Sequence, residues 1–191
     1  RLRAKYPQKP LHVVVEEICA SGGYYVAVAA DQVYVDKASL VGSVGVIMSG
    51  FGVTGLMDKL GVERRLITAG KNKALLDPFT KEDKKQKEFV QDMLGEVHQQ
   101  FIQVVRDGRG KRLKETPDMF SGLVWNGARS IDLGLTDGLG TVDSVAREVF
   151  KAPDVIDYTV KENLAERVAK RFGAAMGEGA TRVFMQAGQI R

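Results

Sequence analysis

Hydrophobic positions in the first half of the chain form short runs whose spacing alternates between that of strands and that of helices. Four runs rich in apolar and β-branched residues are expected to be strands: 11–16, 32–35, 43–48 and 64–68. Two runs of small or periodically spaced apolar residues are expected to be helices: 22–30 and 54–60. Because the valines at positions 13–15 are consecutive, the first strand is expected to be buried on both faces. The alternation predicts an α/β fold with a mostly parallel sheet flanked by helices.

The second half of the chain has the periodicity of helices. Over residues 89–105 apolar side chains recur at spacings of three and four, which predicts a long amphipathic helix ending near Gly108. Thr80 is the expected N-cap of this helix, because the acidic residues at 82 and 83 would then lie in its first turn. Shorter helices are expected over residues 128–133 and 141–150.

A change in pattern after Pro153 divides the chain into two parts. Residues 1–152 are expected to form one α/β domain with a helical second half. Residues 153–191 are expected to form a tail, with a strand over 155–160 followed by a helical or partly disordered segment.

Composition and charge exclude several classes of protein. The 191 residues carry a net charge of +4, but basic and acidic residues are interleaved, as over 81–88, so nucleic-acid binding is not indicated. No stretch approaches 18 consecutive apolar residues, and no transmembrane helix is expected. Cys19 is the single cysteine, which indicates a small buried residue rather than a disulfide or a cysteine metal site. Since the chain begins with Arg1 rather than Met, we expect it to be part of a longer protein.

The histidines offer little support for a Ser-His-Asp triad. The chain has two, His12 at the start of a strand and His98 on the long helix, where its position between the apolar residues indicates a solvated side chain. The nucleophile pattern G-x-S-x-G is absent, because Cys19 precedes Ser21 and Val41 precedes Ser43 where the first glycine would stand. His98 has no partner ligand at helical spacing and His12 stands at the start of a predicted strand, so we expect no metal and no other cofactor.

Ser21 is the candidate nucleophile. It stands before Gly22 and Gly23, between a predicted strand and a predicted helix, where free backbone N–H groups favour negative charge. The Gly22 N–H is then a candidate donor to an oxyanion. The alternative interpretation is that Ser21 caps the helix and the glycines allow close packing.

A serine nucleophile without histidine requires another base, and a neutral lysine is the usual substitute. Lys73 follows a predicted strand and precedes apolar residues, and the nearest acid after it is Asp77. Apolar surroundings without a carboxylate favour the neutral amine. Lys71 is the competing candidate, and both lysines are also compatible with an ordinary exposed position.

Taken together, these segments resemble the signal peptide peptidase A family of bacterial, membrane-anchored Ser–Lys peptidases, whose fold is like that of Clp protease and crotonase. The similar segments are Ala20–Tyr25 with residues 29–31, Val41–Ile47, Ala69–Lys73 with Asp77-Pro78, Phe101–Arg109 and Asp132–Asp137. The resemblance extends from about residue 10 to residue 150. Ala74 departs from it, because many members carry an acidic residue after the lysine.

The resemblance implies a role for each of four residues. Ser21 would be the nucleophile and Lys73 the general base. Ser43 would hydrogen-bond the lysine amine and orient it. The backbone N–H of Gly22 would stabilise the oxyanion. The implied enzyme is a serine endopeptidase.

The resemblance also implies a substrate and an assembly. Remnant signal peptides and other unstructured apolar peptides would lie extended along Val44, Gly45 and Val46. The protein would form a homo-oligomeric ring in which neighbouring protomers share each site. An N-terminal anchor would attach it to the bacterial inner membrane, with the catalytic domain on the extracytoplasmic side. The family's upstream strand and Pro-Gly-Gly oxyanion loop are not found in the sequence, so we expect the chain alone to lack one edge of its active site.

Two alternatives remain open. Gly50-x-Gly52-x-x-Gly55 matches the dinucleotide-binding pattern between a predicted strand and a predicted helix, although no Asp or Glu follows the next strand to hold a ribose. The chain is also compatible with a catalytically inactive oligomeric scaffold of the same fold.

Overall fold

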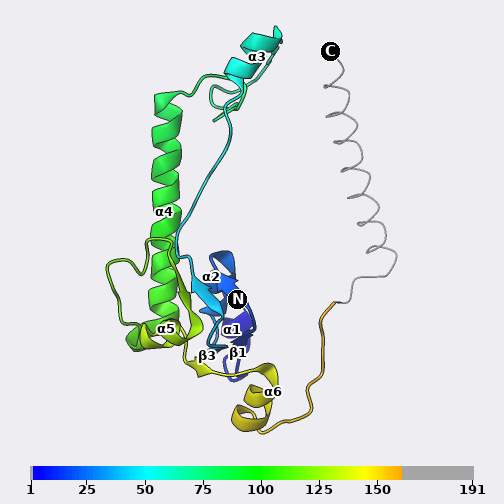
Figure 1. The fold of residues 1–191 in the computed structure, drawn as a ribbon, viewed down its shortest axis with the longest axis vertical. Helices are drawn as coiled ribbons and strands as arrows, with labels where there is room; N and C mark the ends of the chain where they lie inside the picture. Colours follow the sequence, from blue (N-terminus) through cyan, green and yellow to red (C-terminus); the bar gives the residue numbers. More distant parts are fainter. Residues whose placement is uncertain (1, 161–191) are drawn as a thin grey trace. The chain divides into compact units, whose positions relative to one another are not determined.

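The computed structural model describes residues 2–160, of which Leu2 to Pro153 form one compact unit (Figure 1). Residues 154–160 belong to a second unit and form no helix or strand, so the strand expected over 155–160 is wrong. The apolar side chains of Val155 and Val160 are exposed there. The helical or disordered segment expected after residue 160 lies outside the described residues.

Two three-stranded sheets form the centre of the first unit. One contains β1 (His12–Val15), β3 (Gln32–Val35) and β6 (Gly138–Leu139), in the order β1-β3-β6 with all pairs parallel. The other contains β2 (Ile18–Ala20), β4 (Leu40–Gly42) and β5 (Val124–Asn126), in the order β2-β4-β5. In the second sheet β2 and β4 are parallel, and β5 runs antiparallel to β4.

Helices make up the remaining secondary structure of residues 2–160. They are α1 (Leu2–Lys5), α2 (Gly22–Ala27), α3 (Thr54–Leu60), α4 (Lys84–Arg109), η1 (Gly110–Arg112), α5 (Gly127–Asp132), α6 (Val142–Ser144) and η2 (Val145–Val149). The expected α/β class and the mainly parallel strand pairing are confirmed. The strand at 32–35 and the helix at 54–60 have the expected bounds.

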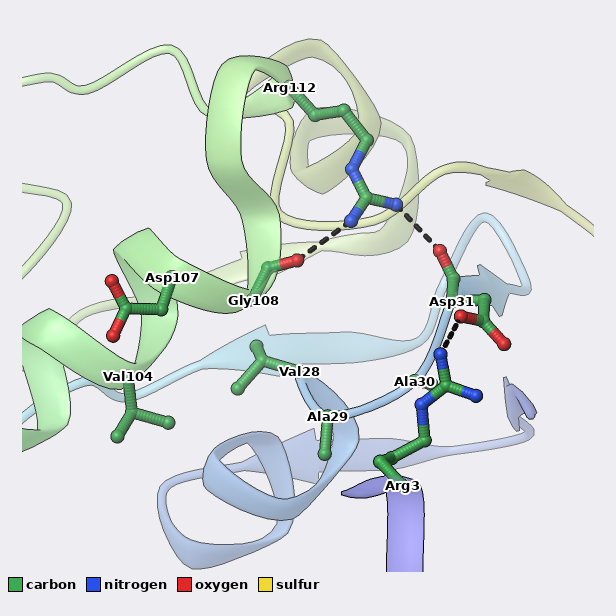
Figure 2. Close-up of a pocket in the computed structure, with 9 residues that line it drawn as sticks. All are labelled: Arg3, Val28, Ala29, Ala30, Asp31, Val104, Asp107, Gly108 and Arg112. Atoms are coloured by element: carbon green, nitrogen blue, oxygen red, sulfur yellow. Dashed lines mark hydrogen bonds and ion pairs between the residues drawn. The ribbon is translucent and has the colours of Figure 1, made fainter. Parts of the chain in front are cut away.

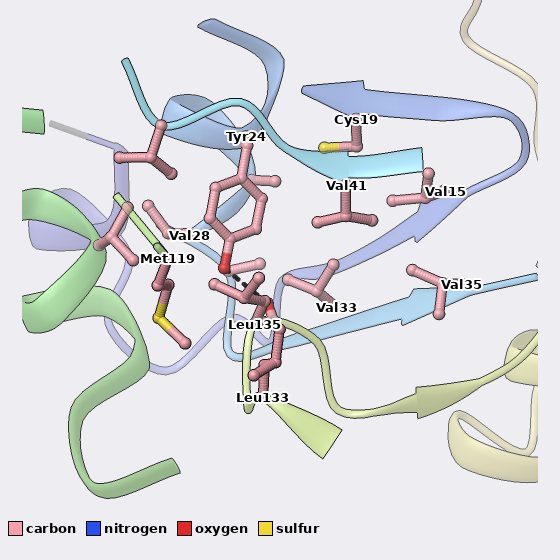
Figure 3. Packing of buried hydrophobic residues seen from close by; sticks show 14 of the residues in the cluster. Val15, Cys19, Tyr24, Val28, Val33, Val35, Val41, Met119, Leu133 and Leu135 are labelled. Carbon is pink, nitrogen blue, oxygen red and sulfur yellow. Dashed lines mark hydrogen bonds between the residues drawn. The ribbon is translucent and has the colours of Figure 1, made fainter. Parts of the chain in front are cut away.

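The hydrophobic core joins the two sheets to α2 and to the C-terminal half of α4. Val33, Val35 and Val41 are fully buried on the strands, as is Val105 on α4. Tyr24 of α2 is also fully buried, and Figure 3 shows its hydroxyl directed at the backbone of Leu135. That hydroxyl donates a 2.7 Å hydrogen bond to the Leu135 carbonyl oxygen. The core therefore fixes the helix that follows Ser21.

Several predicted boundaries are wrong, for identifiable reasons. The segments 43–48 and 64–68 form no strand, because neither finds a partner ladder within the described residues. The chain pairs through 40–42 instead, where Val41 is buried. The N-cap of α4 is Asp83 rather than Thr80, since the Asp83 side chain accepts a 2.9 Å hydrogen bond from the Gln86 N–H. The helix α2 ends at Ala27, three residues earlier than expected.

Candidate active site

Ser21 lies at the sharp turn between β2 and α2. Its backbone has φ 51° and ψ −123°, a conformation that glycine adopts readily and other residues rarely. The Ser21 N–H donates to the Gly42 carbonyl oxygen at 2.8 Å, and the Ser21 carbonyl oxygen accepts from the Tyr25 N–H at 2.9 Å. Ser21 is exposed, and its side chain makes no capping hydrogen bond to α2. The hydroxyl is thus presented to the surface by a strained backbone and is not used as a helix cap.

The first turn of α2 is open to solvent. Gly22 and Gly23 are exposed, and a Cβ atom on either would meet no atom within 4 Å. The first N–H groups of a helix have no intrahelical partner. The backbone beside Ser21 therefore leaves room for an oxygen atom to approach these donors.

Ser43 is brought close to Ser21 by the pairing of β2 with β4. Ala20 is opposite Gly42 in the register, so the residues that follow each strand, Ser21 and Ser43, are neighbours across the ladder. Ser43 also has a positive φ, 52°, and its N–H donates to the Leu123 carbonyl oxygen at 2.7 Å. The expected nucleophile and the expected orienting hydroxyl thus lie at the same end of the second sheet.

The segment from Val44 to Val46 continues from Ser43 between two supports. The Val44 side chain is fully buried, and the Val44 carbonyl oxygen lies 3.2 Å from His98 Nε2. On the other side, a Cβ atom on Gly45 would lie 3.1 Å from the Gly122 Cα atom. The expected peptide-binding segment is therefore anchored although it forms no strand within the described residues.

Lys73 is not brought to Ser21 within one chain. It lies exposed in a turn in which its N–H donates to the Gly70 carbonyl oxygen, and the nearby Leu76 N–H donates to Gln86 Oε1 at 3.1 Å. This turn thus adjoins the N-terminal end of α4, whereas the Ser21 turn adjoins its other half (Figure 1).

The length of α4 sets the distance between the turn that contains Lys73 and the turn that contains Ser21. Tyr25 of α2 packs against Phe101, with ring centroids 5.1 Å apart. At a rise of 1.5 Å per residue, Gln86 and Phe101 are separated by about 22 Å along the helix axis. Lys71 lies in the same turn as Lys73 and is equally remote from Ser21.

Asp77, the acid nearest to Lys73 in sequence, is paired elsewhere. Its carboxylate forms an ion pair with Arg64 and accepts a hydrogen bond from the Phe79 N–H. Burial acts to raise the pKa of Asp77, but these hydrogen bonds outweigh it and hold the pKa below its usual range. Within residues 2–160, no ion pair joins Lys73 to a carboxylate.

Each of the two histidines contacts a residue far away in the sequence. His12 packs against the ring of Phe150 at 4.5 Å. His98 was expected to be solvated, and this is wrong, because it is half-buried and bonded to the Val44 carbonyl. The sequence pattern missed this contact because the partner of His98, the Val44 carbonyl, lies 54 residues away. In the described part of the chain, no cluster of three or more His, Cys, Asp or Glu side chains could hold a metal ion.

The dinucleotide-binding interpretation lacks its structural context. Residues 43–53 form no strand before the glycines, and Cβ atoms on Gly50, Gly52 and Gly55 would each meet nothing within 4 Å. The glycines are therefore not required here for a tight turn between a strand and a helix.

An open cavity of about 650 Å³ lies away from Ser21, between the ends of α2 and α4 (Figure 2). Its charged groups are already paired with the protein. Arg3 forms an ion pair with Asp31, and Arg112 donates to the carbonyl oxygens of Asp31 and Gly108 at 2.8 and 2.7 Å. Asp107 accepts from Gln103 at 2.7 Å. Each charged side chain that lines the cavity thus already has a partner within residues 2–160.

Comparison of the sequence with known proteins identifies a family. Residues 3–155 match the family model of Peptidase family S49. A protein of Methanocaldococcus jannaschii named a putative protease is 34% identical over 161 residues, which are 82% of this chain and 52% of that protein. The chloroplastic serine protease SPPA of Arabidopsis thaliana is 29% identical over 162 residues, 83% of this chain and 23% of that protein.

A further relative has a name from another class. The protein of Brucella abortus named Na(+)/H(+) antiporter NhaA is 45% identical over 143 residues, which are 75% of this chain and 19% of that protein. The chain thus spans about a fifth of the Brucella protein and about half of the M. jannaschii protein. Among the described residues, no helix is both long and apolar enough to cross a bilayer.

The match to the family model covers both sheets, α2 and α4, and includes each of the candidate site residues. The α/β architecture is of the Clp protease/crotonase type, and the resemblance to signal peptide peptidase A is confirmed by a relative that carries the SPPA name. On this evidence the chain belongs to peptidase family S49.

Proposed function

We propose that this chain is the catalytic region of a serine endopeptidase in which Ser21 is the nucleophile and Lys73 the general base. The observation that carries the proposal is the backbone of Ser21, with φ 51° and ψ −123°. Such a conformation costs about 1–3 kcal/mol for a residue with a side chain, and residues held in it cluster at active sites. Because the hydroxyl is exposed and caps no helix, its position is explained by nucleophilic attack.

The proposed reaction is acyl transfer in two steps. The neutral amine of Lys73 accepts the proton from Ser21 Oγ as Oγ attacks the peptide carbonyl carbon. The oxyanion accepts a hydrogen bond from the Gly22 N–H, and Ser43 orients the lysine amine. Lys73 then protonates the leaving amine, the C–N bond breaks, and the acyl group remains on Ser21. A water molecule, deprotonated by Lys73, attacks the ester and releases Ser21 Oγ with its proton restored.

The proposed substrates are remnant signal peptides and other unstructured apolar peptides. Within residues 2–160, the backbone groups of Gly45 and Val46 make no hydrogen bond, so an extended peptide can pair with them. Such pairing requires an unfolded substrate, because a folded protein has already used its backbone groups.

The proposed active enzyme is a homo-oligomeric ring in which a second copy delivers Lys73 to Ser21. Two observations support this assembly. One chain holds these residues near opposite ends of α4. Large apolar side chains between them are exposed without a partner: Ile47 at 86%, Phe51 at 88% and Ile67 at 97%. An exposed apolar segment of this kind is typical of a protein interface.

For the longer protein we propose an anchor in the bacterial inner membrane, with this region on the extracytoplasmic side. The proposal for the anchor rests on the resemblance to signal peptide peptidase A.

The test is turnover of an unstructured apolar peptide by the full-length protein. Ser21→Ala and Lys73→Ala should each lower kcat by a factor of about 10³ or more, because the two residues act as one unit. Lys71→Ala is the matched control, since it removes a lysine from the same turn, and it should retain activity. An equal loss of kcat in Lys71→Ala would show that the choice of Lys73 as the base is wrong. Unchanged turnover by Ser21→Ala would contradict the proposed nucleophile.

A catalytically inactive scaffold is the second candidate. The separation of Ser21 and Lys73 within one chain supports the inactive scaffold only if the two residues also remain apart in the assembled particle. A distance from Ser21 Oγ to Lys73 Nζ beyond hydrogen-bond reach in the assembled particle, together with absent turnover, would establish the scaffold.

A further inference from the structure

We propose that His98 is a positioning residue that holds the peptide-binding segment Ser43–Val46 in place for the reaction. The inference rests on the proposed function, because that function makes this segment the binding edge for substrate. The observation behind it is the 3.2 Å contact between His98 Nε2 and the Val44 carbonyl oxygen.

The direction of this hydrogen bond follows from chemistry. A carbonyl oxygen can only accept, so His98 Nε2 carries the proton and donates it. The imidazole therefore acts as an anchor for the backbone and is not placed as a base toward Ser21.

The anchor acts on a segment whose side chain at Val44 is buried but whose backbone belongs to no β-ladder. The ladder of β4 ends at Gly42, and residues 43–48 belong to no strand. Ser43 has a strained φ of 52°, which persists only where neighbouring contacts determine it. One such contact is the bond from the Ser43 N–H to the Leu123 carbonyl oxygen, and the His98 bond to Val44 is the second. The first bond holds the peptide unit before Ser43, and the second holds the peptide unit after Val44.

The same turn of α4 supports the nucleophile. Phe101 lies three residues after His98, on the same face of the helix, and packs against Tyr25 at 5.1 Å. The Tyr25 N–H in turn donates to the Ser21 carbonyl oxygen. One helical turn thus sets the spacing between the nucleophile and the peptide-binding segment.

Kinetics of the full-length protein test this role through His98→Leu and His98→Gln. The leucine removes the donor, whereas the glutamine amide can donate in place of Nε2. His98→Leu should raise KM for an extended apolar peptide about tenfold, with kcat lowered less than about threefold, since one hydrogen bond is lost away from the reacting atoms. His98→Gln should recover KM to within about threefold of the unaltered protein. Gln99→Leu, an exposed neighbour on α4, is the matched control and should leave KM unchanged.

Hydrogen exchange gives a readout that does not depend on catalysis. In His98→Leu the Ser43 amide should exchange at least about fivefold faster, because the segment bonded to Leu123 loses its second support. The same amide should stay protected in His98→Gln and Gln99→Leu. Unchanged Ser43 protection in His98→Leu would overturn the inference, as would a KM for His98→Gln as poor as that for His98→Leu. An inactive enzyme with the expected exchange pattern would instead count against the proposed function, and the anchoring role would stand.

Discussion

At the scale of single residues, two serines of the candidate site have backbones that favour glycine. Ser21 has φ 51° and Ser43 has φ 52°. Strain of this kind costs about 1–3 kcal/mol for each residue. The Gly42 carbonyl and the Leu123 carbonyl hold these conformations by accepting the N–H groups of the two serines. The proposed reaction needs the hydroxyl of each serine, which glycine lacks.

Replacement of Ser21 should distinguish the effect of its strained backbone on stability from the effect of its hydroxyl on activity. Ser21→Gly should be more stable than Ser21→Ala by about 1 kcal/mol, because glycine relieves the strained φ and this outweighs its larger entropy in the unfolded chain. Both variants lack the hydroxyl and should be inactive. Chemical denaturation measures the difference.

Ser121 provides the control for this comparison, because it lacks a positive φ and is exposed. Ser121→Gly should be less stable than Ser121→Ala, the reverse order. The same order at both positions would show that Ser21 is not strained in solution.

At the scale of elements, the two halves of α4 differ in how closely other residues pack against them. Its C-terminal half is packed closely against α2, since a Cβ atom on Gly108 would lie 2.2 Å from the Val28 carbonyl oxygen. Its N-terminal half has room at Gly95, where a Cβ atom would meet nothing within 4 Å. Phe89 is 60% exposed in that half. Among the described residues, the closest packing of the helix is therefore in its C-terminal half, against the end of α2.

The two glycines of α4 should respond in opposite ways to alanine. Gly95→Ala should stabilise the protein by about 1 kcal/mol, because alanine has the higher helix propensity and there is space for its methyl group. Gly108→Ala should destabilise it by about 1–3 kcal/mol, because the methyl group would push the Val28 backbone away. Thermal unfolding of both variants against the unaltered protein is the measurement. Stabilisation by Gly108→Ala would contradict the packing of α4 on α2.

At the scale of the whole molecule, a buried ion pair connects the end of α4 to the chain beside β6. Arg109 is 1% exposed and donates to both carboxylate oxygens of Asp137, at 2.8 and 2.9 Å. The Val33 N–H also donates to Asp137, at 2.7 Å. Burial acts to raise the pKa of Asp137, but the hydrogen bonds from Arg109 and Val33 outweigh it, so the pKa lies below its usual range.

This pair predicts how stability depends on pH. Since the pKa of Asp137 is lower in the folded state, its contribution is fully present above the unfolded-state pKa of about 3.9 and is lost as pH falls through the lower folded value. Asp137→Asn should cost about 3–5 kcal/mol at neutral pH, because Arg109 keeps a buried charge without its partner. The difference from the unaltered protein should shrink below about pH 4.

The exposed pair between Arg106 and Glu115 is the matched control, with nitrogen and oxygen 2.7 Å apart. Glu115→Gln should cost less than about 1 kcal/mol, because solvent screens an exposed pair. Denaturant titrations at several pH values compare the two. Equal costs for the two variants would mean that Arg109 is not buried in solution.

A second prediction at this scale concerns the proposed assembly. If each site combines Ser21 of one protomer with Lys73 of the next, mixing Ser21→Ala and Lys73→Ala protomers should restore activity. Random assembly leaves about one quarter of the sites with both residues intact. A mixture of Ser21→Ala with the double variant is the control and should stay inactive. Failure to restore activity after verified subunit exchange would exclude shared sites.

The sequence by itself determined many of the local elements and the family. The strand at 32–35, the helix at 54–60 and the long helix near 84–109 follow from side-chain periodicity, because burial of one face imposes that spacing. The Ser21-Gly22-Gly23 segment between strand and helix was also evident in the sequence, and with the other motifs it identified the family.

Only the tertiary structure decided which segments meet. Residues 43–48 and 64–68 have strand-like composition but form no strand, because a strand requires a partner ladder that local sequence does not specify. His98 acquires its role from a carbonyl 54 residues away. The strained φ of Ser21 arises from the pairing of β2 with β4, and the remoteness of Lys73 from the length of α4. Each of these depends on contacts between residues far apart in the sequence, which side-chain pattern alone does not encode.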